Sequence, residues 1–168
     1  IPVRNGKFKF KAKLDVSTTG WMKLKSRPGM PDAYFPFVPG EEAIFSCKMS
    51  YSRFRLDGTQ FYKDHQRNND FMDFLYAPYD SLKAENDRLE EMGLTQNQID
   101  SIVAPKRKAL KERTFDLFFA YLKEHAHEDA SASLVNFGGP LMVDSIVGMP
   151  APEVRNGRMK ESIERSLR

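Results

Sequence analysis

The sequence predicts an α+β fold, in which a small antiparallel β-sheet or sandwich is followed by a multi-helix region. Through residues 1–57 apolar and polar residues alternate with a period of two, between turns rich in proline and glycine, as in short β-strands. From residue 59 onwards apolar residues recur at helical spacing instead. We expect residues 1–58 and 59–168 to pack together as one continuous domain, because a chain of 168 residues can enclose one core of good size.

The composition is that of a globular protein with few specialised features. The 26 basic and 23 acidic residues leave a net charge of +3, which is too small to indicate a nucleic-acid partner. The single cysteine excludes an intrachain disulfide, a Cys-x-x-Cys pair and a cysteine zinc cluster. No apolar run reaches the roughly 20 residues of a transmembrane helix. The sequence shows no initiator methionine or signal peptide, so we expect a processed piece of a longer protein.

The first expected strand, residues 7–14, follows a turn at Asn5-Gly6. Its lysines and its apolar residues fall on opposite parities, so they should point to opposite faces. A nucleic-acid platform needs aromatic and basic side chains in one groove, so we interpret the lysines as the soluble face or edge of a sheet. The two sets are Lys7, Lys9, Lys11 and Lys13, and Phe8, Phe10, Ala12 and Leu14.

Four more short strands are expected before the helical region. Pro36 would interrupt the second of them, which suits an edge or irregular strand better than a central one. Pro39-Gly40 predicts a type II turn before the third, and Phe54 and Leu56 should face inward in the fourth. The expected strands cover residues 21–25, 33–38, 41–49 and 51–57.

Proline and glycine should divide the helical region into several segments. Thr59 can cap the first helix, which Pro78 should end. Thr95 and Gln98 form a capping box for the third, and Pro105 should kink or restart that helix. The expected helices cover residues 60–76, 80–92 or 81–92 (stopped by Gly93), 95–105, 105–124, 130–137, 141–147 and 158–167.

Cys47 is the first residue considered as a reactive group, because a thiol can serve redox or nucleophilic chemistry. It shares its strand parity with Ala43, Phe45 and Met49. A cysteine on an apolar face is usually buried and inert, with a raised pKa. We therefore expect Cys47 to be a structural residue.

Residues 125–129 hold four potential metal ligands or acid-base groups, namely His125, His127, Glu128 and Asp129. They fall at an expected helix C-terminus, where a protonated histidine complements the helix dipole without any ligand. The two histidines would point about 200° apart on a helix, so they could share a metal only if the chain leaves the helix there. An enzyme that uses this cluster is one functional hypothesis.

Asp64, His65 and Asp70 lie on a polar stretch of the first expected helix, and spacing gives them no serine or cysteine partner. We interpret that stretch as a solvated face. We therefore predict no catalytic residue, no cofactor and no bound metal.

The strands carry more aromatic residues than a small sheet needs. Core packing explains most of them, and an exposed subset could form an apolar surface for a peptide or a second domain. These residues are Trp21, Tyr34, Phe35, Phe37 and Tyr51.

The order of these features resembles a known family, the domain of unknown function that precedes the thioredoxin-like module in Bacteroidota-type periplasmic thiol-disulfide oxidoreductases. The resemblance rests on four segments. A leading strand of the form nGkFxF matches residues 5–10, a Pro-Gly-Glu turn and strand match 39–45, and a strand-to-helix step matches 56–61. A helix–turn–helix segment matches 119–134, where residues 125–132 replace the family's Asn-Pro-Asp-Ser-like turn.

The resemblance implies a non-catalytic accessory domain of a periplasmic or outer-envelope-associated oxidoreductase. Such a domain would engage substrate, dimerise or position the redox module, so the expected partner is a thioredoxin-like module or another protein. The Trp-Cys-x-x-Cys module itself is not in this chain, so oxidoreductase activity cannot be assigned to any residue here. The alternative is a stand-alone binding protein for a peptide, glycan or other small ligand.

The resemblance also has a consequence for assembly. Family members usually begin with a further pair of strands, which would be the neighbours of residues 7–14. An unpaired strand edge invites pairing with another chain. We therefore expect a possible homodimer through the N-terminal sheet.

Overall fold

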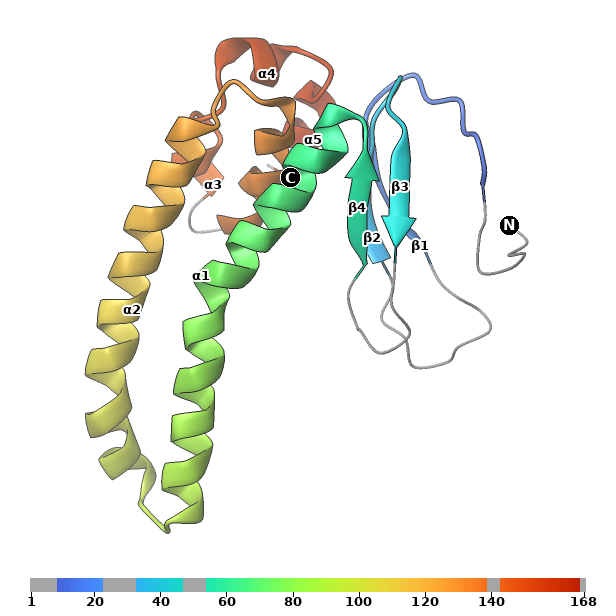
Figure 1. Cartoon of the computed structure of the whole chain (residues 1–168). Coiled ribbons are helices and arrows are strands. Elements are labelled where there is room, and N and C mark those ends of the chain that lie inside the picture. Colours follow the sequence, from blue (N-terminus) through green and yellow to red (C-terminus); the bar gives the residue numbers. More distant parts are fainter. Residues whose placement is uncertain (1–8, 23–32, 47–53, 139–142, 167–168) are drawn as a thin grey trace.

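The computed structural model has the expected α+β arrangement, with two small antiparallel sheets followed by long helices. It describes residues 9–22, 33–46, 54–138 and 143–166. Two long helices form an antiparallel hairpin that projects far beyond the strands, and the short C-terminal helices gather around the end of the hairpin nearest the sheets (Figure 1).

The strands form two separate pairs. β1 (Thr18–Met22) pairs with β2 (Ala33–Phe37), and β3 (Ala43–Ser46) pairs with β4 (Arg55–Gly58), both antiparallel. Aromatic rings join the pairs, because the Phe35 and Phe45 centroids lie 4.2 Å apart. Pro36 is tolerated in β2 because, among the described residues, this strand pairs with β1 alone and so lies at a sheet edge.

Two glycines determine how β3 and β4 connect to the rest of the chain. The Glu41 N–H donates to the Val38 carbonyl at 3.2 Å, and Gly40 has φ +78°, which confirms the type II turn predicted from Pro39-Gly40. Gly58 has φ +127°, and a Cβ there would collide with the Glu42 carbonyl oxygen. Only glycine fits this step from β4 into the first helix.

The hairpin consists of α1 (Gln60–Glu91) and α2 (Gln96–Glu124). Thr59 and Thr95 are the N-cap residues, and the capping box of Thr95 and Gln98 is formed as predicted. Gly93, with φ +80°, ends the turn after α1 as expected.

The C-terminal segment from residue 129 folds back over the base of the hairpin. It contains the 3₁₀ helix η1 (Asp129–Gly138) and the short helices α3 (Val143–Ile146), α4 (Pro152–Asn156) and α5 (Lys160–Ser166). Arg165 in α5 donates to the Thr18 hydroxyl at 2.9 Å, and the Ser17 hydroxyl donates to the Arg158 carbonyl at 2.8 Å. The end of the described chain is thereby attached to β1.

The core has two parts. The larger lies where the strands, α1, α2 and the C-terminal helices meet, and it includes Phe35, Phe61, Leu122 and Leu134. The smaller holds the far end of the hairpin together through Leu89, Ile99 and Val103. Apolar burial therefore stabilises the tip as well as the base.

The expected strand over residues 7–14 is wrong for its described part, because residues 9–14 form no strand. Alternation determines which side chains share a face, but a strand also needs a backbone neighbour. The Phe10 ring instead packs edge-on against Phe37, with 6.2 Å between centroids. Residues 7 and 8 lie outside the described part.

The expected helix end at Pro78 and break at Pro105 are also wrong, since α1 and α2 run through both residues. A helical proline leaves the carbonyl four residues earlier without its N–H donor. Both prolines are exposed, and so are Phe74 and Ser101, whose carbonyls lose that donor. Water can reach these groups, which lowers the cost of the missing bonds. The two helices expected over 60–92 are consequently one.

Candidate functional site

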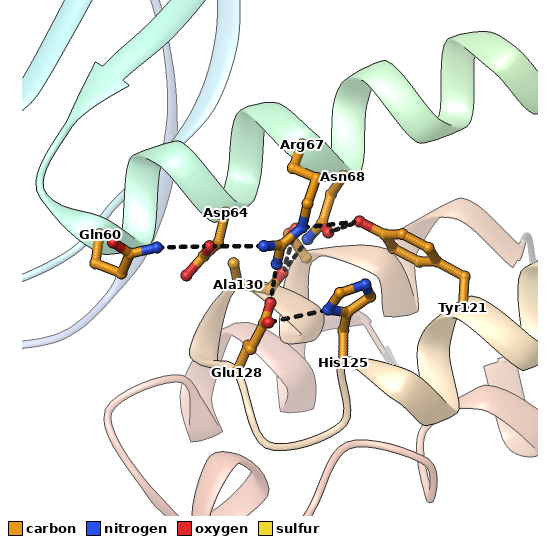
Figure 2. A network of polar contacts seen from close by, with 9 residues as sticks. Gln60, Asp64, Arg67, Asn68, Tyr121, His125, Glu128 and Ala130 are labelled. Atoms are coloured by element: carbon orange, nitrogen blue, oxygen red, sulfur yellow. Dashed lines mark hydrogen bonds and ion pairs between the residues drawn. The ribbon is translucent and has the colours of Figure 1, made fainter.

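A network of polar side chains joins the first half of α1 to the end of α2 and the start of η1 (Figure 2). Its most buried member is Asn68, which is 0% exposed. The Asn68 Nδ2 donates to the Ala130 carbonyl at 3.0 Å, and its Oδ1 accepts from the Tyr121 hydroxyl at 2.9 Å. Burial raises the pKa of Tyr121, so the phenol keeps the proton that it donates to Asn68.

Arg67 extends this network toward solvent (Figure 2). Its guanidinium forms ion pairs with Asp64, at 3.1 Å, and with Glu128, and its Nε donates to the Tyr121 hydroxyl at 3.3 Å. Glu128 also contacts His125 Nδ1 at 2.9 Å. Arg67 therefore joins the two helices and the turn after α2.

His65 lies next to the network in a more apolar setting. Its Nδ1 is 3.0 Å from the Ser133 hydroxyl, which donates its own proton to the Ala130 carbonyl at 2.7 Å. The Ser133 oxygen can then only accept, so Nδ1 carries the proton of a neutral imidazole. Burial lowers the pKa of His65 to about 4, so the ring is neutral at physiological pH.

This arrangement is structural, and we call the four residues that form it, Arg67, His65, Asn68 and Tyr121, the lock. Arg67, His65, Asn68 and Tyr121 each have a partner inside the chain. Within residues 9–22, 33–46, 54–138 and 143–166, no group of three or more His, Cys, Asp or Glu side chains could hold a metal ion. The network fixes the register of α1, α2 and η1.

The structure separates the histidine cluster. α2 ends at Glu124, and His125 then pairs with Glu128. His127 is exposed and pairs with Glu153 at 2.5 Å. This hydrogen bond lowers the pKa of the Glu153 carboxyl. Asp129 accepts from Arg158 at 2.5 Å. His125 and Glu128 therefore stay paired with each other, whereas His127 and Asp129 bind Glu153 and Arg158, which lie outside the predicted cluster.

The predicted solvated face of the first helix is wrong for two of its three residues. Asp64 and His65 are buried, whereas Asp70 is exposed. Asp70 accepts from Arg55 at 3.1 Å and from Gln66 at 2.8 Å. Polarity suggested exposure, but helical position determines which side chains face the core.

Of the lock residues, the sequence singled out only His65, as part of a solvated face, although the spacing along α1 gives a signal for burial. Phe61, His65, Asn68, Met72 and Leu75 recur at alternating intervals of four and three residues, and all five are buried. That spacing marks one continuous helical stripe. A polar residue inside such a stripe indicates a buried hydrogen-bonded group.

The aromatic residues of the strands are partly accounted for by the core. Phe35 is buried, and its ring lies 4.5 Å from that of Phe37. Trp21 and Tyr34 are backbone partners in the β1–β2 register. Tyr51 and Cys47 lie outside the described residues.

Apolar side chains remain exposed on the hairpin. Phe71 stacks on Tyr121 with 3.7 Å between centroids, and Phe74 lies 6.4 Å from Phe71 while remaining 59% exposed. Leu117, 36% exposed, lies one turn before Tyr121 on α2. We call Phe71, Phe74, Leu117 and Tyr121 the hairpin surface.

Comparison with known proteins finds no matching family model, no matching curated protein and no matching solved structure. No helix in the described part of the chain is long and apolar enough to cross a membrane.

Proposed function

We propose that this chain is a non-catalytic accessory domain that binds another protein. The observation that carries the proposal is the hairpin surface. Its most exposed residue, Phe74, is 59% exposed although it is large and apolar. Aromatic residues gathered on a protein surface are typical of the anchors by which proteins bind one another.

The surroundings of this surface support binding rather than chemistry. The Phe71–Tyr121 stack and the Arg67 contacts hold its base in place. Little conformational entropy would then be lost when a partner covers Phe74 and Leu117. A rigid apolar patch beside satisfied polar groups suits a docking role.

The partner we propose is the thioredoxin-like redox module that the family resemblance implies. The chain would position that module or its substrate, in the periplasm or at the outer envelope. A module attached to the same polypeptide has an effective concentration in the millimolar range, so a weak surface suffices.

A direct binding measurement tests this proposal. A thioredoxin-like module with a Cys-x-x-Cys site is taken from an oxidoreductase with this type of N-terminal domain, and titrated into the chain. We expect saturable binding that Phe74→Ser weakens at least about tenfold, since an aromatic anchor contributes about 2 kcal/mol or more.

Tyr76→Ser is the matched control, because Tyr76 is 46% exposed but lies about 200° away around α1 from Phe74. Equal weakening by both variants, or no binding at about 1 mM, would contradict the proposal. Saturable binding of a short peptide or glycan instead would favour the stand-alone binding protein.

A further inference from the structure

β3 has one edge paired with β4, and its other edge has no strand partner among the described residues. The Thr59 N–H donates to the Glu42 carbonyl at 2.9 Å, which sets the hydrogen-bonding phase of the β3–β4 pair. Hydrogen-bonded and non-hydrogen-bonded pairs alternate along an antiparallel ladder. Because Glu42 belongs to a hydrogen-bonded pair, Ala43 and Phe45 belong to non-hydrogen-bonded pairs, and their N–H and C=O groups point away from β4. Within the described residues, no backbone group hydrogen-bonds to these outward groups.

The opposite edge of the same sheet is closed. The Leu56 N–H, which points away from β3, donates to Gln66 Oε1 on α1 at 2.7 Å. Gln66 is in turn held by Asp70 at 2.8 Å. Any extension of this two-stranded sheet must therefore add to β3.

The side chains of β3 allow such an extension. Ala43 and Phe45 pack toward the core, whereas Ile44 is 54% exposed on the other face. The strand contains neither lysine nor proline, two common means of protecting an edge. A sheet of two strands alone is only marginally stable, whereas a sheet of four strands is more stable.

We propose that β3 pairs antiparallel with β3 of a second copy of this chain, about a two-fold axis at Ile44. This register pairs Ala43 with Phe45 of the second copy, and the reverse, so every outward N–H and C=O of the two residues finds a partner. Each Ile44 then faces Ile44 of the second copy in a close pair, with about 4.5 Å between Cα atoms. A symmetric contact of this kind closes as a dimer.

The flanking residues fit the same register. Glu42 lies opposite Ser46 of the second copy. Within that copy Ser46 pairs with Arg55 of β4, so Glu42, Ser46 and Arg55 form one row across the strands. Glu42 and Arg55 are both exposed and carry opposite charges, and Arg55 also forms an ion pair with Asp70 of its own chain at 3.1 Å. The small Ser46 between them leaves room for contact, so the pairing sets complementary charges near each other.

Disulfide trapping tests the register. In a Cys47→Ser background, Ile44→Cys should crosslink two copies under mild oxidation, because about 4.5 Å between Cα atoms is within disulfide reach. Ser46→Cys is the matched control, since each Ser46 lies two residues from the axis and the pair is about 13 Å apart. We expect crosslinking of Ile44→Cys to be at least about tenfold faster. Equal rates, or no crosslinking of either variant, would overturn the proposal.

Sedimentation equilibrium tests the dimer itself. Ile44→Lys places two like charges face to face and should raise the dimer dissociation constant at least about tenfold. Met92→Lys, at the exposed tip of the hairpin, should leave it unchanged. Matching circular dichroism spectra would show that both variants fold. A monomeric wild type at about 1 mM, or a dimer unaffected by Ile44→Lys, would contradict the proposal.

This inference is independent of the proposed accessory function, because it uses β3 and not the hairpin surface. It also differs from the expected dimer through residues 7–14, whose described part forms no strand. Loss of dimerisation in Ile44→Lys with retained binding of a redox module would separate the two proposals.

Discussion

A single amide side chain, Asn68, joins three elements at the base of the hairpin. It is fully buried and bonds to both Ala130 and Tyr121. Apolar residues would fill the same space, but they could not satisfy the Tyr121 hydroxyl in the same way. Asn68 therefore specifies how α1, α2 and η1 align.

Removing this amide should be costly. We expect Asn68→Ala to lower the free energy of unfolding by about 2–3 kcal/mol, because it leaves a cavity and removes two buried hydrogen bonds. Asn69→Ala, at the half-buried neighbouring position, should change it by less than about 1 kcal/mol. Urea unfolding measures both, and equal effects would contradict the assigned role.

His65 should make stability depend on pH. Its folded-state pKa of about 4 lies below the ordinary 6.5, so the unfolded chain binds a proton more readily between these values. Its contribution is fully present above about pH 6.5 and is lost as the pH falls toward 4. At 1.36 kcal/mol per unit, the loss amounts to about 3 kcal/mol.

Urea unfolding between pH 7.5 and 4 checks this prediction. His65→Gln should lose this part of the pH dependence, whereas His127→Gln, which changes an exposed histidine, should keep it. Parallel pH profiles for the wild type and His65→Gln would show that the imidazole does not control acid stability.

At the scale of elements, glycine determines where β4 becomes α1. Gly58 and Gly40 both have positive φ, but only at Gly58 would a Cβ strike backbone, at the Glu42 carbonyl. Gly40 has no atom within 4 Å of that position. An alanine at Gly40 would therefore suffer backbone strain alone, whereas an alanine at Gly58 would suffer both strain and a steric collision.

We expect Gly40→Ala to cost about 1–2 kcal/mol from the left-handed conformation alone. Gly58→Ala should cost more, about 4 kcal/mol, because the β3–β4 pairing must also shift. Thermal unfolding of the two variants compares them directly, and similar melting temperatures would contradict the assigned collision.

Pro78 offers a test of the continuous α1. Since the helix runs through this exposed residue, Pro78→Ala should restore a backbone hydrogen bond and raise the unfolding free energy by about 1–3 kcal/mol. Pro36→Ala, in β2, gives the comparison outside a helix. A destabilised Pro78→Ala would mean that α1 is broken there.

Local signals predicted the element boundaries that depend on neighbouring residues. The type II turn at Pro39-Gly40, the Thr95 capping box and the stop at Gly93 are all formed. The failures at residues 9–14 and at Pro78 have another origin, because strand pairing and solvent access depend on distant parts of the chain. The buried polar lock was missed because polarity was interpreted without regard to the helical stripe.

At the scale of the whole molecule, the strands and short helices form a base from which the hairpin projects (Figure 1). The tip has its own apolar cluster around Ile99 and Val103, and the lock holds the base. The hairpin surface lies on the tip side of the lock, since Phe74 follows Asn68 in α1 and Leu117 precedes Tyr121 in the antiparallel α2. This arrangement presents an exposed apolar patch on a fixed support.

The most direct test of protein binding by the hairpin is amide hydrogen exchange on the chain joined, through a flexible linker after Arg168, to a thioredoxin-like module with a Cys-x-x-Cys site. We predict slower exchange around Phe74 and Leu117 than in the isolated chain, and loss of that protection in Phe74→Ser. Exchange around Met92 should not change, because the tip lies outside the hairpin surface. Identical exchange at Phe74 and Leu117 with and without the module would contradict the account.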